Sequence, residues 1–184
     1  MISRDMDPAE LGALVCETLL VSGISAVLTG GTCVSVWTRN EFASLDLDFI
    51  ALGLHSNMDI ARALEELGFK RSVGSPRYFE HPDTNLSLEF PPGPLMVGDE
   101  HILDQKVDAY ATEHGTLRLL SPTDCVKDRL AGYYYFRDEQ NLRQAIAVAR
   151  EQPVDWQDLE RWHEVERQVE GFREFERAVY ETRT

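Results

Sequence analysis

Two aspartates, Asp46 and Asp48, stand one residue apart inside the apolar run SLDLDFIAL, which spans residues 44–52. Apolar residues alternate with them, so the run predicts a strand with both acids on one face. Charged side chains rarely enter a buried strand without a partner. Two carboxylates about 7 Å apart repel each other unless a cation neutralises them. Mg²⁺ is the natural cation, because it binds carboxylate oxygens and shares phosphate oxygens. On an edge strand, the same two acids would simply face the solvent.

A glycine pair precedes these acids in the chain. Gly30 and Gly31 follow the short apolar run 24–29 and open a predicted short helix. Glycines at this position let backbone N–H groups approach a phosphate chain, and Thr32 adds a hydroxyl donor. Gly30-Gly31 alone would more often be a simple turn. Together with the acid pair, it indicates a nucleoside triphosphate held with two Mg²⁺ ions, which clamp the attacking and leaving oxygens of a phosphoryl or nucleotidyl transfer.

A third carboxylate is expected at the same metals. Glu89 lies in the run LSLEF, residues 86–90, where the apolar residues again alternate with polar ones. This pattern predicts a strand with Glu89 on its polar face, beside the strand of Asp46 and Asp48. The alternative is an exposed strand acid with no role in metal binding.

The order of the predicted elements indicates an α+β fold with a helical C-terminal half. Gly, Pro, Asn and Ser signals separate the segments, and residues 91–98 read as a loop. The chain predicts strands over 24–29, 44–52, 69–73, 77–81 and 85–91, and helices over 8–22, 32–38, 57–67, 121–136, 138–152 and 155–181.

Composition restricts the partners and the compartment. The 184 residues carry a net charge of −14, which opposes broad binding to nucleic acid or anionic membranes. A local basic groove stays open as an alternative; its candidates are Lys70, Arg71, Arg77, Arg129 and Arg137. Three scattered cysteines indicate reduced core thiols, and no signal peptide or membrane span is expected, so we predict a cytoplasmic protein.

Gly-Gly, a short helix, Asp-x-Asp in an apolar strand and a lone acid on a later strand resemble the nucleotidyltransferase superfamily, with its polymerase-beta-like fold. The resemblance covers roughly residues 25–150 and is greatest to small bacterial abortive-infection and type IV toxin nucleotidyltransferases. It implies a mixed sheet flanked by helices over 1–120 and helices packed on this core over 121–184. Glu89 stands where the commoner residue is Asp, and Thr32 where many members have Ser.

The resemblance also implies functional residues. Asp46, Asp48 and Glu89 would be catalytic and hold the metals, while Gly30, Gly31, Thr32, Lys127 and Asp138 would bind the nucleotide. Each of the last two has a simpler interpretation. Lys127 can be a solvated helix lysine, and Asp138 can cap the helix that follows it.

The expected activity is transfer of a nucleoside monophosphate from an NTP to an acceptor hydroxyl. The resemblance suggests RNA, such as a tRNA end, as the acceptor of a toxin with an antitoxin partner; a protein or a small molecule is the alternative acceptor. A different class of function is a catalytically silent NTP-binding or protein-interaction module that uses the last helix as its contact.

Two apolar clusters in the C-terminal half need an explanation. The aromatic run Gly132–Phe136 could stack a nucleotide base, but adjacent helix aromatics mostly pack. The last predicted helix carries an apolar stripe, which would either dock on its own domain or form a homodimer interface. The stripe consists of Leu159, Trp162, Val165, Val169, Phe172, Phe175 and Val179.

Overall fold

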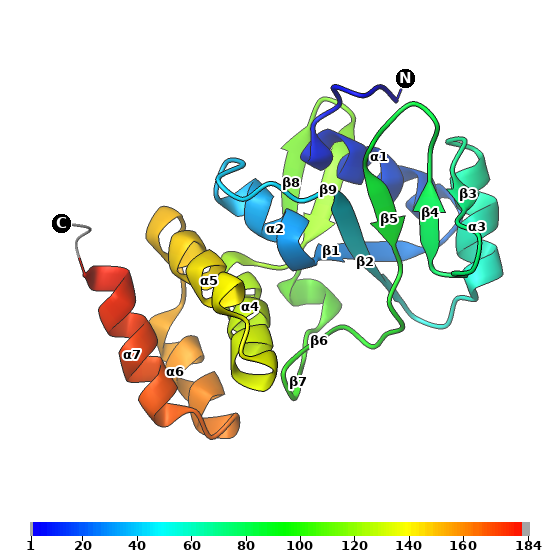
Figure 1. Ribbon diagram of the computed structural model, residues 1–184. Helices are drawn as coiled ribbons and strands as arrows, with labels where there is room; N and C mark the ends of the chain where they lie inside the picture. The colour runs from blue at the N-terminus through cyan, green and yellow to red at the C-terminus, as the bar shows by residue number, and fades with distance from the viewer. Residues whose placement is uncertain (1, 182–184) are drawn as a thin grey trace.

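The computed structural model describes residues 2–181. It has the predicted α+β architecture, with a mixed seven-stranded sheet and its helices at one end of the molecule and a group of four C-terminal helices at the other (Figure 1). The sheet ends with strand β9 at Leu119, and helix α4 begins at Pro122. Met1 and residues 182–184 of the two expected parts lie outside the described residues.

Three helices belong to the sheet region: α1 (Pro8–Val21), α2 (Gly30–Trp37) and α3 (Asn57–Glu65). Asp7 caps α1, because its carboxylate accepts a hydrogen bond of 2.8 Å from the Ala9 amide. Helix α3 is capped by Ser56, whose side chain forms a capping box with Asp59. Helix α2 starts two residues earlier than expected, at the glycine pair itself.

The seven strands are arranged in the order β3-β4-β5-β2-β1-β9-β8. Strands β2 and β5 pair in parallel, as do β1 and β9, whereas the other neighbours are antiparallel. Their bounds are β1 (Ser25–Thr29), β2 (Asp46–Leu52), β3 (Lys70–Arg71), β4 (Tyr78–Glu80), β5 (Ser87–Glu89), β8 (Asp108–Thr112) and β9 (Gly115–Leu119).

The segment between β5 and α4 differs most from the sequence prediction. The expected loop 91–98 contains strand β6 (Met96–Val97), which forms a small hairpin with β7 (Glu100–His101), and a 3₁₀ turn follows at Asp104–Lys106. The hairpin β8–β9 was not predicted at all. Its turn reaches Gly115, whose φ of +128° suits glycine.

One face of the sheet forms the main core. Leu47 and Leu117 pack beneath Gly12 of α1, and Phe49 stacks on Phe90 with ring centroids 5.6 Å apart. Burying each such side chain contributes about 1.5–3 kcal/mol. Because strand residues alternate, this packing turns Asp46 and Asp48 to the opposite face.

The C-terminal helices are α4 (Pro122–Phe136), α5 (Glu139–Glu151), α6 (Trp156–Val165) and α7 (Val169–Tyr180). The sequence predicted one helix over 155–181, but the chain breaks at Arg167, which has a φ of +58°. The break bends the apolar stripe around the helices. Its Leu159, Trp162, Phe172, Phe175 and Val179 are buried within the molecule, and only Val165 and Val169 at the break are exposed. Docking on its own domain therefore accounts for most of the stripe.

None of the helices formed by residues 2–181 combines the length and the apolar character needed to cross a membrane.

Candidate functional site

The strand pairing brings the three predicted acids to one face of the sheet. Strands β2 and β5 run in parallel, with Asp48 opposite Glu89 and Asp46 opposite Ser87. Residues directly opposite each other in paired strands point to the same face. The structure therefore places Asp46, Asp48 and Glu89 together on the face opposite the main core, in the arrangement that the alternation predicted.

Asp48 is the acid whose ionisation this environment disfavours most. Partial burial raises its pKa to about 7, and the negative charge of Glu89 adds to the shift, followed by smaller effects of Asp46 and Asp128. Arg129 acts in the opposite direction. The face that carries Asp46, Asp48 and Glu89, called the acid face below, therefore has more negative charge than Arg129 neutralises.

Hydroxyl groups flank the other two acids. The Ser87 hydroxyl donates a hydrogen bond to the Asp46 carboxylate. Tyr78 lies opposite Glu89 on β4, and hydrogen bonding to Glu89 raises the pKa of the Tyr78 phenol. Within residues 2–181, no three His, Cys, Asp or Glu side chains converge closely enough to form a metal-binding group. The donor set nevertheless suits Mg²⁺, because it consists of carboxylates on one face with excess negative charge.

The glycine pair meets this acid face. Gly30 has a φ of +68°, and a Cβ atom there would overlap the Asp48 carboxylate. Gly30 is thus required both by the backbone and by the aspartate beside it. Gly31 is less restricted, since its Cβ would lie 3.3 Å from the Ser44 hydroxyl oxygen. No side chain caps helix α2, so its first amides are free of a capping bond, as a phosphate-binding helix start requires.

Thr32 has a different place from the one predicted. Its side chain is fully buried, and its hydroxyl donates a hydrogen bond of 2.6 Å to the Asp46 carbonyl oxygen. This bond ties helix α2 to the start of β2. Thr32 therefore positions the acid strand, and its hydroxyl proton is not directed to a phosphate.

Lys127 is not brought to the acid face. Its ammonium lies within 3.2 Å of the carboxylates of Glu100, Asp124 and Asp158, and its side chain is 0% exposed. Burial alone would lower the pKa of Lys127, but the three carboxylates outweigh it and raise the pKa. Lys127 is neither solvated nor free to bind phosphates, so the structure disagrees with both interpretations of the sequence.

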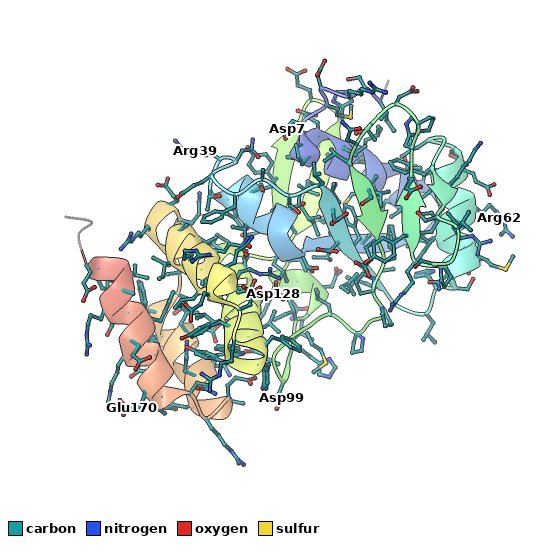
Figure 2. All side chains as sticks on the ribbon, in the orientation of Figure 1. Asp7, Arg39, Arg62, Asp99, Asp128 and Glu170 are labelled. Atoms are coloured by element: carbon teal, nitrogen blue, oxygen red, sulfur yellow. The ribbon has the colours of Figure 1, made fainter. Side chains whose placement is uncertain are left out.

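Arg129 and Asp128, and not Lys127, are the α4 residues whose charges act on the acid face. Both act on the ionisation of Asp48, and Figure 2 shows Asp128 where the C-terminal helices meet the sheet region. The Arg129 guanidinium donates to the Asp128 carboxylate, with nitrogen–oxygen distances of 2.5 and 3.1 Å, and to the Asn141 side-chain oxygen at 3.0 Å. Asp128 was missed in the sequence. The sequence signal for Asp128 is its spacing from Cys125. A residue three positions after a buried helix residue lies on the same side of the helix, and Cys125 is fully buried.

Asp138 caps helix α5, as its simpler interpretation proposed. Its carboxylate accepts a hydrogen bond of 2.9 Å from the Gln140 amide and another of 3.3 Å from the Asn141 side chain. Since Asn141 in turn accepts from Arg129, two hydrogen bonds link Asp138 to Arg129. This is a positioning role, and nucleotide contact by Asp138 stays a prediction.

The aromatic run at the end of α4 divides into packed and exposed residues. Tyr134 packs against Trp162 and His163. Tyr135 and Phe136 are exposed and, with Asp128, Arg129 and Asn141, line a cavity of about 510 Å³. This cavity shares Asp128 and Arg129 with the surroundings of Asp48, so it lies beside the acid face.

Comparison with known proteins identifies the fold. No family model and no curated protein sequence matches the chain. Among solved structures, the antibiotic-resistance factor ANT(2'')-Ia, an aminoglycoside nucleotidyltransferase, matches with a TM-score of 0.51 over 90% of this chain and 91% of its own. This chain has the nucleotidyltransferase fold. The two sequences are 12% identical, and a nucleotidyltransferase fold at that identity leaves the activity of this chain to be argued from its own residues.

Proposed function

We propose that this chain is a Mg²⁺-dependent nucleotidyltransferase, which transfers a nucleoside monophosphate from an NTP to an acceptor hydroxyl and releases pyrophosphate. One observation supports this proposal above the others. The Asp48 carboxylate lies against Gly30 at the uncapped start of α2, so the acid pair proposed to hold Mg²⁺ lies next to the helix start proposed to receive the phosphates.

In this proposal, Asp46, Asp48 and Glu89 hold Mg²⁺, which when bound neutralises the phosphates and polarises the reacting oxygens. The first amides of α2 receive the phosphate chain next to Gly30. Arg129 supports the ionised form of Asp48 from the C-terminal side of the site.

The reaction follows from these positions. The acceptor oxygen attacks the α-phosphorus, and the bond between this phosphorus and the bridging oxygen of pyrophosphate breaks. Glu89, which lies opposite Asp48 on the neighbouring strand, accepts the hydroxyl proton as the general base. The pyrophosphate leaves on the side of Gly30 and Gly31.

Fewer residues of the structure bear on the choice of acceptor than on the transfer itself. We favour RNA, because Lys70 and Arg71 are exposed on β3, an edge strand of the sheet, two strands away from Glu89. Lys70 lies opposite Glu80, which offsets part of its charge. The toxin role and an antitoxin partner depend on this acceptor: expression of the wild type, but not of the Asp48→Asn variant, should then arrest growth.

A labelling experiment tests the activity and the acceptor together. The protein is incubated with each NTP radiolabelled at the α-phosphate, with or without Mg²⁺, and with total cell extract. We expect Mg²⁺-dependent label that RNase removes, and its loss in Asp48→Asn. Arg71→Glu should weaken the labelling of RNA, while Arg173→Glu, an exposed arginine on α7, serves as the matched control.

Other outcomes separate the parts of the proposal. Label that protease removes would identify a protein acceptor, and label in small metabolites would identify a small-molecule acceptor. Both would overturn the RNA acceptor and the toxin role while supporting nucleotidyl transfer. No label with any NTP, combined with no Mg²⁺-dependent thermal shift, would contradict the activity and favour a silent module. That alternative has lost its proposed contact surface, since most of the apolar stripe of the last helices is buried.

A further inference from the structure

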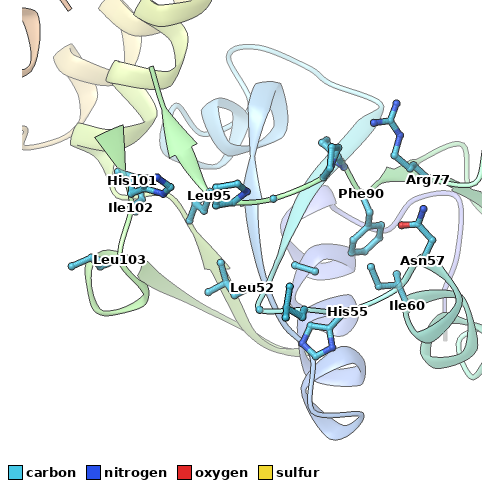
Figure 3. A pocket seen from close by; sticks show the side chains of 17 residues that line it. Leu52, His55, Asn57, Ile60, Arg77, Phe90, Leu95, His101, Ile102 and Leu103 are labelled. Atoms are coloured by element: carbon cyan, nitrogen blue, oxygen red, sulfur yellow. The ribbon is translucent and has the colours of Figure 1, made fainter. Parts of the chain in front are cut away.

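A second cavity lies apart from the acid face. It has a volume of about 920 Å³ and sits at the far end of β2, between the start of α3, the proline-rich segment after β5 and the residues that follow β7 (Figure 3). None of Asp46, Asp48 and Glu89 lines it. Its volume lies within the range of small-molecule sites, which are concave and mostly apolar.

The interior of this distal cavity is apolar and well buried. Ile60, Phe90, Leu95 and Ile102 line it, and each is at most 6% exposed. These residues come from three separate segments of the chain, so the shape of the cavity depends on the packing of the core. A ligand with an apolar body would find a preformed surface here, without the cost of ordering a loop.

The charge of the lining differs sharply from that of the whole chain. The chain has 32 acidic residues against 18 Lys and Arg, yet the 17 residues that line the cavity include no Asp or Glu. They do include Arg77, His55 and His101, which Figure 3 shows at separate places around the cavity. In a molecule with a net charge of −14, this cavity is a local exception that favours a negative ligand.

Arg77 is the group that would recognise the charge. Within residues 2–181, its guanidinium forms no ion pair, although carboxylates are abundant on the surface. A guanidinium presents a fixed array of donors that suits the oxygens of a carboxylate, sulfonate or phosphate. Arg77 is exposed at the edge of the cavity, and its backbone is fixed there, because its carbonyl oxygen accepts a hydrogen bond of 3.0 Å from the Phe90 amide.

We propose that the distal cavity binds a small organic anion, with an apolar body against Ile60, Phe90 and Ile102 and one acidic group at Arg77. This inference does not depend on nucleotidyl transfer, since the cavity and the acid face share no residue among those named for the reaction.

Fluorescence titration with 8-anilinonaphthalene-1-sulfonate tests the proposal, because this probe is an apolar body with one anionic group. We expect one saturable site per chain. Arg77→Gln should weaken binding about tenfold, as expected for the loss of one charged hydrogen bond. Arg71→Gln, which removes an exposed arginine outside the cavity, should leave the affinity unchanged.

Three further comparisons separate specific binding from general adhesion of the probe. The neutral analogue N-phenyl-1-naphthylamine should bind more weakly than the sulfonate and should not respond to Arg77→Gln. Leu103→Glu, at an exposed position of the lining, adds a carboxylate and should weaken the sulfonate while the protein stays folded. Octanoate should displace the probe, and octylamine at the same concentration should not.

The outcomes that overturn the proposal are specific. Equal affinity of wild type and Arg77→Gln, equal affinity for the charged and neutral probes, or displacement by octylamine as well as by octanoate would each exclude an anion site at Arg77. The Asp48→Asn variant should bind the sulfonate like the wild type. This control separates the test of the cavity from any failure of the proposed transferase activity.

Discussion

The structure contains two groups of three carboxylates, and they differ in whether a buried cation neutralises them. On the acid face, Asp46, Asp48 and Glu89 face the same direction without an internal ion pair, and the pKa of Asp48 rises to about 7. In the second group, Glu100, Asp124 and Asp158 surround the buried Lys127. There the pKa of Glu100 and of Asp158 is lowered, because hydrogen bonds and charges from Lys127 and Arg161 outweigh the effect of burial.

The two groups differ in whether the fold supplies a cation. A carboxylate cluster that contains its own cation is neutralised within the fold and joins β7, α4 and α6. A cluster without one is destabilising by itself and gains stability from an external cation. The same reasoning assigns Lys127 to the fold and leaves the acid face as the place for ligand chemistry.

The largest expected effect tests the acid face. Asp48→Asn should reduce nucleotidyl transfer by at least about 1,000-fold, because a metal-binding carboxylate supplies several kcal/mol of transition-state stabilisation. Without Mg²⁺, the variant should melt at a higher temperature than the wild type, since it removes repulsion with Glu89 and Asp46. Label transfer and thermal unfolding measure the two effects.

Asp83→Asn, an exposed acid in the turn between β4 and β5, is the control for this prediction. Undiminished transfer by Asp48→Asn would remove the acid face from the mechanism. A lower melting temperature would show that the three carboxylates are not in conflict.

The next effect tests the second group of carboxylates, which surrounds Lys127. Lys127→Met should destabilise the protein by about 3 kcal/mol, because it leaves three carboxylates without their shared buried cation. Urea unfolding measures this change. Lys106→Met is the matched control: Lys106 is 48% exposed and 3.7 Å from Glu100, so its loss should cost less than about 1 kcal/mol. Unchanged stability of Lys127→Met together with lost nucleotide binding would restore the sequence-based assignment of Lys127.

A smaller effect tests the contact between Asp48 and Gly30 at the start of α2. Gly30→Ala places a side chain at a φ of +68° against the Asp48 carboxylate, and the strained backbone should cost about 2 kcal/mol. Calorimetry should also show weaker binding of Mg²⁺–NTP. Gly31→Ala meets only the Ser44 hydroxyl at 3.3 Å and should be milder in both measurements. Equal effects of the two variants would argue against the close contact of Gly30 with Asp48.

The smallest effect concerns a buried group of the C-terminal helices whose partners are neutral. His163 lies between the Leu159 carbonyl oxygen at 2.6 Å and the Tyr134 hydroxyl at 3.0 Å. Burial lowers the pKa of His163, so the unfolded chain takes up a proton at a higher pH than the folded one. Its contribution to stability is therefore complete above pH 6.5 and is lost as the pH falls below that value.

Denaturant unfolding between about pH 5 and 8, which brackets the ordinary pKa of histidine, measures how the free energy of unfolding changes with pH. His163→Gln should flatten the decline of stability towards acidic pH, and His55→Gln, an exposed histidine, should not. A wild-type stability that rises as the pH falls below 6.5 would contradict the assignment.

Much of the acid face could be predicted from the sequence. Alternation within residues 44–52 and 86–90 fixes which side chains share a face of a strand, so Asp46, Asp48 and Glu89 were expected to point the same way. The glycine pair was also visible, although the contact with Asp48 that requires glycine at residue 30 was not. Local patterns carry this information because strand geometry repeats every two residues.

Other residues depend on partners that are distant in the sequence. Lys127 reads as a solvated helix lysine until Glu100 and Asp158 are placed beside it, at separations of 27 and 31 residues. The hairpin β8–β9 was missed, and the last helix was predicted without its break at Arg167. Neither feature has a strong local pattern, so long-range packing decides both.

Local patterns in the sequence predicted the order of most elements and the side chains of β2 and β5 that share a face. The tertiary structure alone decided which cation serves which acid, and that the distal cavity has a lining without acids. The physical reason is that periodicity and capping act within a few residues, whereas charge neutralisation depends on distances between side chains from different elements. Those distances exist only once the chain has folded.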